Sequence, residues 1–197
     1  MLYPFILSDD PDQFDHLTSI RHPPGGWSPT FNLLDGVRRA DVWSPVPFEH
    51  RPTRHPSYRK NRGKPVDFPS LMGLGLAFSE RALQVLDPLM GQNVEALPLE
   101  CANCGQDKFF VINVLDVVDC LDEPRCIIKR ASTGHILWIN SYAFRPGSME
   151  GHHIFKVPQQ VVGDVLVSPE FKRRVEESGL VGAVFREVGR DADLARN

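Results

Sequence analysis

The stretch from Lys108 to Val118 (KFFVINVLDVV) constrains the fold more than any other part of the sequence. Apolar residues occupy both sets of alternating positions along most of it, so neither face of a strand formed here can meet solvent. Such a strand lies in the middle of a sheet that is covered on both sides. The rest of the chain must therefore supply a strand at each edge and a packing layer on each face.

The first 70 residues contain most of the seventeen prolines, and proline disfavours both helix interiors and central strands. We expect short extended segments joined by turns, beginning with a strand within Met1–Asp10 and including a reversal at His22–Trp27 (HPPGGW). Four aromatic residues can anchor these segments on the core: Trp27, Phe31, Trp43 and Phe48. A ligand groove lined by these rings is the alternative interpretation.

A first helix is predicted after Ser79, whose hydroxyl can cap the free backbone N–H groups of the first turn. Pro88 and Gly91 should distort or end this helix. Its apolar residues recur at helical spacing and form one buried stripe: Ala82, Leu83, Leu86 and Met90.

A second helix is predicted after Ser168, with Pro169 at its first position. Phe171 and Val175 lie four residues apart and share a face, and Gly179 can adopt the left-handed conformation that ends a helix. Further strands are expected at 136–144, 151–157 and 180–188.

These elements predict a single α+β domain with a mainly antiparallel sheet, a few packed helices and a loop-rich N-terminal part. We place this domain at residues 1–188, with the loop-rich part at 1–77, a core at 78–188 and a flexible tail at 189–197. A chain of this size buries about 70% of the surface that its unfolded form exposes, so it needs neither a metal nor a disulfide for stability.

The compartment is predicted from what the sequence lacks. No apolar run approaches the roughly 20 residues that cross a bilayer. The first ten residues lack the basic start and the longer apolar run of a signal peptide. We therefore expect a cytoplasmic protein that has no membrane partner and keeps its four cysteines reduced.

The formal net charge of −3 is unevenly distributed. His50–Lys64 contains six basic residues and no acidic one, so it carries +6, which leaves −9 for the rest of the chain. A compact basic segment can contact nucleic acid phosphates or an acidic protein. Its prolines and glycine favour a solvated loop, and the acidic remainder argues against nucleic acid as the main partner.

The four cysteines suggest zinc only weakly. Cys101 and Cys104 form a CxxC pair, but five residues rather than two separate Cys120 from Cys126. Cys120 also follows a strongly apolar segment, where a free cysteine packs as a small hydrophobic residue. A thioredoxin-like pair is disfavoured because no helix start follows Cys101. We expect structural cysteines, no metal and no cofactor; the alternative is a zinc-stabilised nucleic-acid-binding module that uses segment 50–64.

No combination of residues predicts a catalytic site. His152–His153 lacks the spacing of a zinc-protease motif, and on a strand the two rings would point to opposite faces. Gly73–Leu76 (GLGL) is too short for a dinucleotide-binding loop. A hydrolase that uses Cys104 or the histidines is a third hypothesis, supported by no spacing. We therefore expect that the chain is not an enzyme.

Asp116, Asp119, Asp122 and Glu123 form the densest acidic group. Neighbouring carboxylates can bind a metal or exchange protons, and they can equally end a strand and face solvent. A third interpretation is that they face a basic partner surface and steer its association. We take Asp119, Asp122 and Glu123 as the candidate partner-binding residues.

The order of elements from Phe78 to Val188 resembles a bacterial immunity-protein family, the eleventh in classifications of polymorphic toxins. The resemblance consists of the serine-led helix (SERAL, 79–83), the apolar strand leading to VDCLD (118–122), HHIF (152–155), the helix after Val167-Ser168, and the closing turn and strand with Gly179, Leu180, Gly182 and Phe185. The CxxC pair and segment 50–64 are not part of this pattern.

This resemblance implies a cytoplasmic protein, encoded beside a secreted or contact-delivered toxin, that protects its own cell by binding the toxin domain. Such proteins act by occlusion and need no catalysis. The family indicates little about which residues contact the toxin, so the surface residues named above rest on their charge alone.

Overall fold

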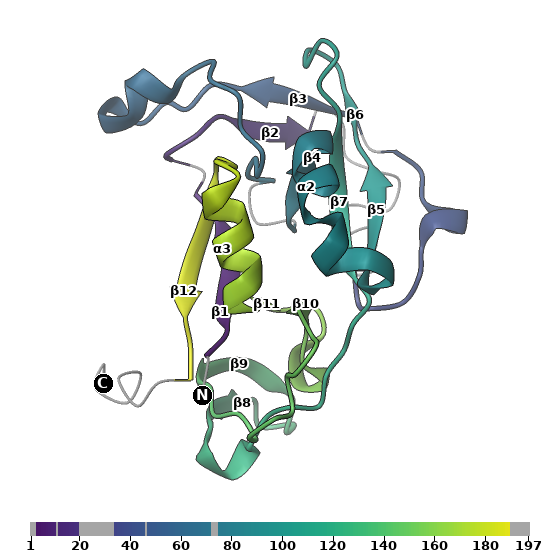
Figure 1. Ribbon diagram of the computed structural model, residues 1–197, viewed down its shortest axis with the longest axis vertical. Coiled ribbons are helices and arrows are strands. Elements are labelled where there is room, and N and C mark those ends of the chain that lie inside the picture. Colours follow the sequence, from purple (N-terminus) through teal and green to yellow (C-terminus); the bar gives the residue numbers. More distant parts are fainter. Residues whose placement is uncertain (1–2, 11, 20–33, 46, 72–74, 190–197) are drawn as a thin grey trace.

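The computed structural model describes residues 3–10, 12–19, 34–45, 47–71 and 75–189 (Figure 1). The predicted reversal at His22–Trp27, the aromatic anchor Phe31, residues 73–74 of the GLGL segment and the tail from residue 190 lie outside these ranges. The boundaries predicted for the domain and its two parts stay predictions.

Helix α2 (Glu80–Met90) forms as predicted: the Ser79 hydroxyl accepts a hydrogen bond from the Ala82 N–H at 3.1 Å. The helix continues past Pro88 and ends at Gly91, whose φ of 46° suits glycine. Ala82, Leu86 and Met90 are buried, and Leu83 is partly buried against the same apolar cluster.

Helix α3 (Pro169–Glu177) repeats this design, because the Ser168 hydroxyl accepts from the Phe171 N–H at 3.1 Å. Phe171 and Val175 are buried, and Gly179 ends the turn at a φ of 61°. Within the described ranges, no helix is both long and apolar enough to cross a membrane.

The α+β prediction is confirmed, and strand pairing is mainly antiparallel. The first sheet has the order β10 (Ile154–Phe155), β11 (Val165–Val167), β1 (Phe5–Asp9), β12 (Ala183–Glu187). The second is β2 (His16–Ser19), β3 (Pro47–Arg51), β6 (Glu100–Cys101), with β3 and β6 parallel. The third is β4 (Ala77–Ser79), β7 (Phe109–Val114), β5 (Val94–Pro98). Within the described residues, β8 (Ile127–Arg130) pairs only with β9 (Ile136–Ser141).

Short 3-10 helices lie in the connections between these elements: η1 (Ala40–Val42), η2 (Pro56–Asn61), η3 (Gly91–Asn93), η4 (Glu123–Arg125) and η5 (Pro158–Gln160). The predicted strands at 136–144, 151–157 and 180–188 form β9, β10 and β12, each shorter than predicted.

Strand β7 is the central strand that its sequence predicts, although it ends at Val114 instead of Val118. Phe110 lies opposite Phe78 of β4 and opposite Pro98 of β5. The two faces of β7 belong to different apolar clusters, because Val111 packs with β2 and β3 while Ile112 packs with α2 and α3. Both faces are therefore covered.

The sheet around β1 is covered in the same way. Leu7 packs with the two helices, whereas its neighbour Ile6 packs with β9 and the segment that follows it. The helices therefore lie between the β4–β7–β5 sheet and the β10–β11–β1–β12 sheet, and the β8–β9 hairpin lies at the far end of the molecule (Figure 1).

A buried carboxylate, Asp67, joins these layers. It accepts hydrogen bonds from the Ser79 hydroxyl (2.8 Å), the Arg81 guanidinium (2.9 Å) and the Val181 N–H (2.9 Å). Arg81 also donates to the Ser178 carbonyl at 2.8 Å. The start of α2 is thereby tied to the turn between α3 and β12.

We predict that Asp67→Ala lowers the free energy of unfolding by about 2–4 kcal/mol, because it leaves the Val181 N–H and the Arg81 guanidinium without their acceptor. Urea unfolding followed by circular dichroism measures this loss. Asp87→Ala, at an exposed position of α2, is the control and should change stability by less than about 0.5 kcal/mol. Equal effects of the two substitutions would contradict the role of Asp67.

Lys156 is a buried cation that holds the segment after residue 33 against the sheet. Its ammonium group donates to the Leu34 carbonyl at 2.6 Å, and only 4% of the residue is exposed. Burial lowers the pKa of Lys156 to about 8, although the Asp35 carboxylate acts in the opposite direction. At neutral pH the folded protein thus keeps a charged group whose burial costs free energy.

Stability should therefore rise with pH through this group. Below pH 8 both states carry the protonated lysine and the folded state bears the full cost of burial; above it the unfolded state binds more protons. From pH 7 to pH 9 the wild type should gain about 1 kcal/mol relative to Lys156→Met, which lacks the titrating group. Denaturant unfolding at both pH values tests this, and parallel pH profiles would refute it.

Candidate partner-binding surface

The three candidate residues Asp119, Asp122 and Glu123 lie together after β7, on the connection to β8. They line one cleft of about 440 Å³, which we call the acidic cleft. Its other lining residues are Leu121, Pro124, Arg145, Pro158 and Gln159. Three carboxylates and one guanidinium give this lining a formal charge of −2.

Each carboxylate of the acidic cleft also contacts an arginine. Asp119 lies 3.2 Å from Arg145, Glu123 3.0 Å from Arg130, and Asp122 3.8 Å from Arg125. All three pairs are substantially exposed, and such pairs contribute little to stability. Arg125 and Arg130 can therefore exchange for an incoming cation at low cost.

Arg145 organises the cleft from a distance in sequence. Its guanidinium donates to the Leu121 carbonyl at 2.7 Å and to the Asp119 carbonyl, in addition to the Asp119 carboxylate. The loop that carries the acidic residues is thus fixed by a side chain that follows β9. The role of Arg145 could not be predicted from the sequence, because no local pattern links this residue to residues 119–121.

Asp116, the fourth acidic residue, belongs to a different site. Its carboxylate contacts His152 Nδ1 at 2.6 Å, while His153 Nδ1 contacts the Ser168 hydroxyl at 2.9 Å. Both histidines line an open cavity of about 370 Å³, which we call the histidine cavity. It shares Arg145 with the acidic cleft, so the two hollows adjoin.

Three of the exposed large apolar residues are Leu137 and Trp138 on β9 and Val162 just after η5, exposed by 44%, 44% and 55%, and we refer to them together as the apolar patch. Helix η5 connects this patch to the acidic cleft, because Gln159 donates to the Glu123 carboxylate (2.8 Å) and Gln160 to the Leu137 carbonyl (3.4 Å). The sequence pattern predicted a strand here but not this exposure. The pairing of β8 with β9 shifts register between Lys129 and Arg130, and this irregularity, which interrupts the alternation of side chains, has no signal in the sequence.

The basic segment 50–64 folds around a buried acid, Asp15. The Asp15 carboxylate accepts from the Thr53 N–H (2.9 Å) and the Gly63 N–H (2.8 Å) and lies 3.6 Å from the His50 ring. All six basic residues of the segment are exposed. The geometry matches the solvated-loop interpretation.

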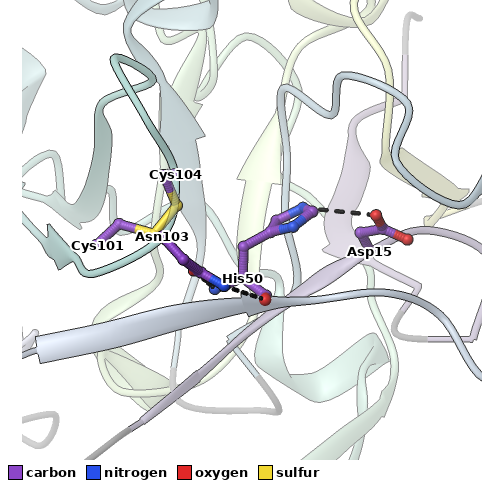
Figure 2. The surroundings of a disulfide bond; sticks show 5 residues. All are labelled: Asp15, His50, Cys101, Asn103 and Cys104. Atoms are coloured by element: carbon purple, nitrogen blue, oxygen red, sulfur yellow. Dashed lines mark hydrogen bonds and ion pairs between the residues drawn. A yellow bond between two sulfur atoms is a disulfide. The ribbon is translucent and has the colours of Figure 1, made fainter.

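Cys101 and Cys104 form a disulfide, which corrects the expectation that all four cysteines are reduced (Figure 2). The turn after β6 brings their Cα atoms to 5.5 Å, within the usual range for a disulfide. Between them, the Asn103 amide accepts from the His50 N–H (2.7 Å) and donates to the His50 carbonyl (3.0 Å). The turn is thereby bound to β3, and two of the four thiolates required by the zinc alternative are used.

Cys120 and Cys126 are free thiols in this structure. Cys120 is fully buried among apolar residues, and burial raises its pKa to about 11. Cys126 is half-buried and accepts a hydrogen bond from the Ala143 N–H, and burial likewise raises its pKa. Among the described residues, no group of three or more His, Cys, Asp or Glu side chains is placed to hold a metal.

The described part of the chain thus presents the acidic cleft, the apolar patch and the histidine cavity on its surface. A family model described as the Immunity protein family (Imm11) matches residues 51–190, more than half of the chain. The chain therefore belongs to this immunity protein family. The match includes the CxxC pair and most of the basic segment, so it extends beyond the resemblance at 78–188. No curated protein matches the sequence.

The absence of zinc stays a prediction. Protein purified without added metal should contain no stoichiometric zinc, and a chelator should not shift its unfolding midpoint, because a structural zinc contributes on the order of 10 kcal/mol. Cys120→Ala should cost about 1–2 kcal/mol through lost packing. One equivalent of zinc that disappears in Cys101→Ser or Cys104→Ser would contradict this prediction.

Proposed function

We propose that this protein is a cytoplasmic immunity protein that binds one cognate toxin domain and neutralises it by occlusion, without catalysis. Family membership supports the role and a toxin as partner. The observation that carries the choice of surface is the acidic cleft joined to the apolar patch by η5.

The apolar patch supplies affinity in this proposal. Trp138 is an aromatic residue with nearly half its surface exposed, and Lys129 Nζ stacks over its ring at 4.3 Å. Tryptophan is enriched among the few interface residues that dominate binding energy. Its burial together with Leu137 and Val162 would give the interface an apolar centre.

The acidic cleft supplies specificity. Asp119, Asp122 and Glu123 border this centre and present carboxylates to a basic toxin surface, as the charged rim of an interface does. Because each already contacts an arginine, a partner must offer matching cations at the same positions to replace those contacts. A toxin without them would bury the existing pairs and remove their water without a compensating contact.

The test uses the toxin domain encoded next to this chain. Co-expression should rescue cells from that toxin, and the purified pair should co-elute as a stoichiometric complex. Trp138→Ala should lose both properties or weaken the complex at least tenfold, whereas Tyr58→Ala on the basic segment should not. A toxin that keeps full activity in the presence of saturating wild-type protein would contradict the proposed function.

Charge reversal tests the acidic cleft separately. Asp119→Lys/Glu123→Lys should slow association with the toxin about tenfold at low salt and affect dissociation less, since rim charges act mainly on encounter. The effect should shrink at high salt. Stopped-flow fluorescence or surface plasmon resonance measures both rates.

The matched control is Glu176→Lys/Glu177→Lys, which changes net charge equally on the exposed side of α3, where both acids also pair with basic neighbours. It should leave association nearly unchanged. Equal slowing by the two double variants would show an effect of net charge alone and would remove the acidic cleft from the interface.

A further inference from the structure

We infer that the histidine cavity is an anchor site for a lysine or arginine side chain of the toxin. This inference rests on the proposed function and specifies a second contact point for the same partner. The cavity of about 370 Å³ opens between the segment around Glu150 and the start of α3, next to the acidic cleft.

The charged group of the cavity that remains available is an acceptor. Glu150 is exposed, and no ion pair of its carboxylate occurs within the described residues. The Asp116 carboxylate engages His152 Nδ1 at 2.6 Å, so this ring nitrogen is not available to an occupant. The Glu150 carboxylate suits a donor such as an ammonium or a guanidinium.

The other polar residues are already engaged within the protein. Arg145 is held by the 119–121 loop, and Glu170 is bonded by Arg173 at 2.9 and 2.6 Å. The Ser168 hydroxyl accepts from the Phe171 N–H and contacts His153. Within the described lining, the Glu150 carboxylate is therefore the charged group left for an occupant.

The charge of the lining excludes an anion as the preferred occupant. The formal charges of its arginine and two glutamates sum to −1, and the carboxylates of Asp116 and Asp119 contact the lining residues His152 and Arg145. The positive end of α3 would otherwise attract an anion, but Glu170 and the Ser168 cap already occupy it. A cation is the complementary charge.

The walls suit the stem of a long basic side chain. Pro4, Met149, Phe155 and Pro169 contribute apolar surface, along which a lysine or arginine can bury its methylene groups while its charged head reaches an acceptor. Because the cavity shares Arg145 with the acidic cleft, one basic toxin segment can span both hollows.

The test measures binding of the folded full chain to the neighbouring toxin domain by isothermal titration calorimetry. Glu150→Trp, which fills the mouth of the cavity, should weaken binding at least tenfold, and Glu150→Gln should weaken it several-fold by removing the charge. Gln84→Trp and Glu177→Gln, at exposed helical positions, are the matched controls and should bind as wild type. Circular dichroism confirms that each variant is folded.

A double-mutant cycle identifies the occupant. Alanine replacement of one lysine or arginine of the toxin should lose its effect in the Glu150→Trp background. If wild type binds but Glu150→Trp binds equally well, or if every basic toxin position is additive with it, the anchor site is wrong and the proposed function stands. If wild-type protein does not bind the toxin, both the proposed function and the anchor site are wrong.

Discussion

The buried carboxylate of Asp67 is the constraint on which the layered arrangement depends. It joins the start of α2 to the turn that leads into β12, so it sets the positions of both helices at once. The helices lie between two sheets and supply the cover that β7 and β1 require. A single acid thereby couples elements more than a hundred residues apart in sequence.

The candidate partner-binding surface lies outside these layers and packs on a separate apolar cluster. The apolar face of β1 that turns away from the helices packs with Cys120, Leu121 and Ile139. The loop 119–123 and the β8–β9 hairpin therefore pack on the same apolar cluster. Arg145 then fixes the loop through backbone carbonyls. The surface is therefore a rigid extension of the core, which limits the entropy that binding would cost.

Local signals were sufficient for the helices and for β7. The caps Ser79 and Ser168 act within four residues, and the two apolar faces of β7 are visible in consecutive positions. The clustering of Asp119 and Glu123 followed from their spacing. The partners of these acids could not be predicted, because Arg145 and Gln159 are distant in sequence and come close only when the chain folds. The Cys101–Cys104 disulfide could not be predicted either, because it depends on redox conditions that cysteine spacing does not reveal.

The hydrogen bond from Gln160 to the Leu137 carbonyl has a consequence for the protein before it meets a partner. Within the described residues the hairpin pairs with no further strand, and an open, apolar strand edge recruits other chains into aggregates. Gln160 occupies the Leu137 carbonyl of this hairpin, and Lys129 places a charge over the Trp138 ring. The hairpin can thus expose apolar side chains and still resist pairing with a second copy of the chain.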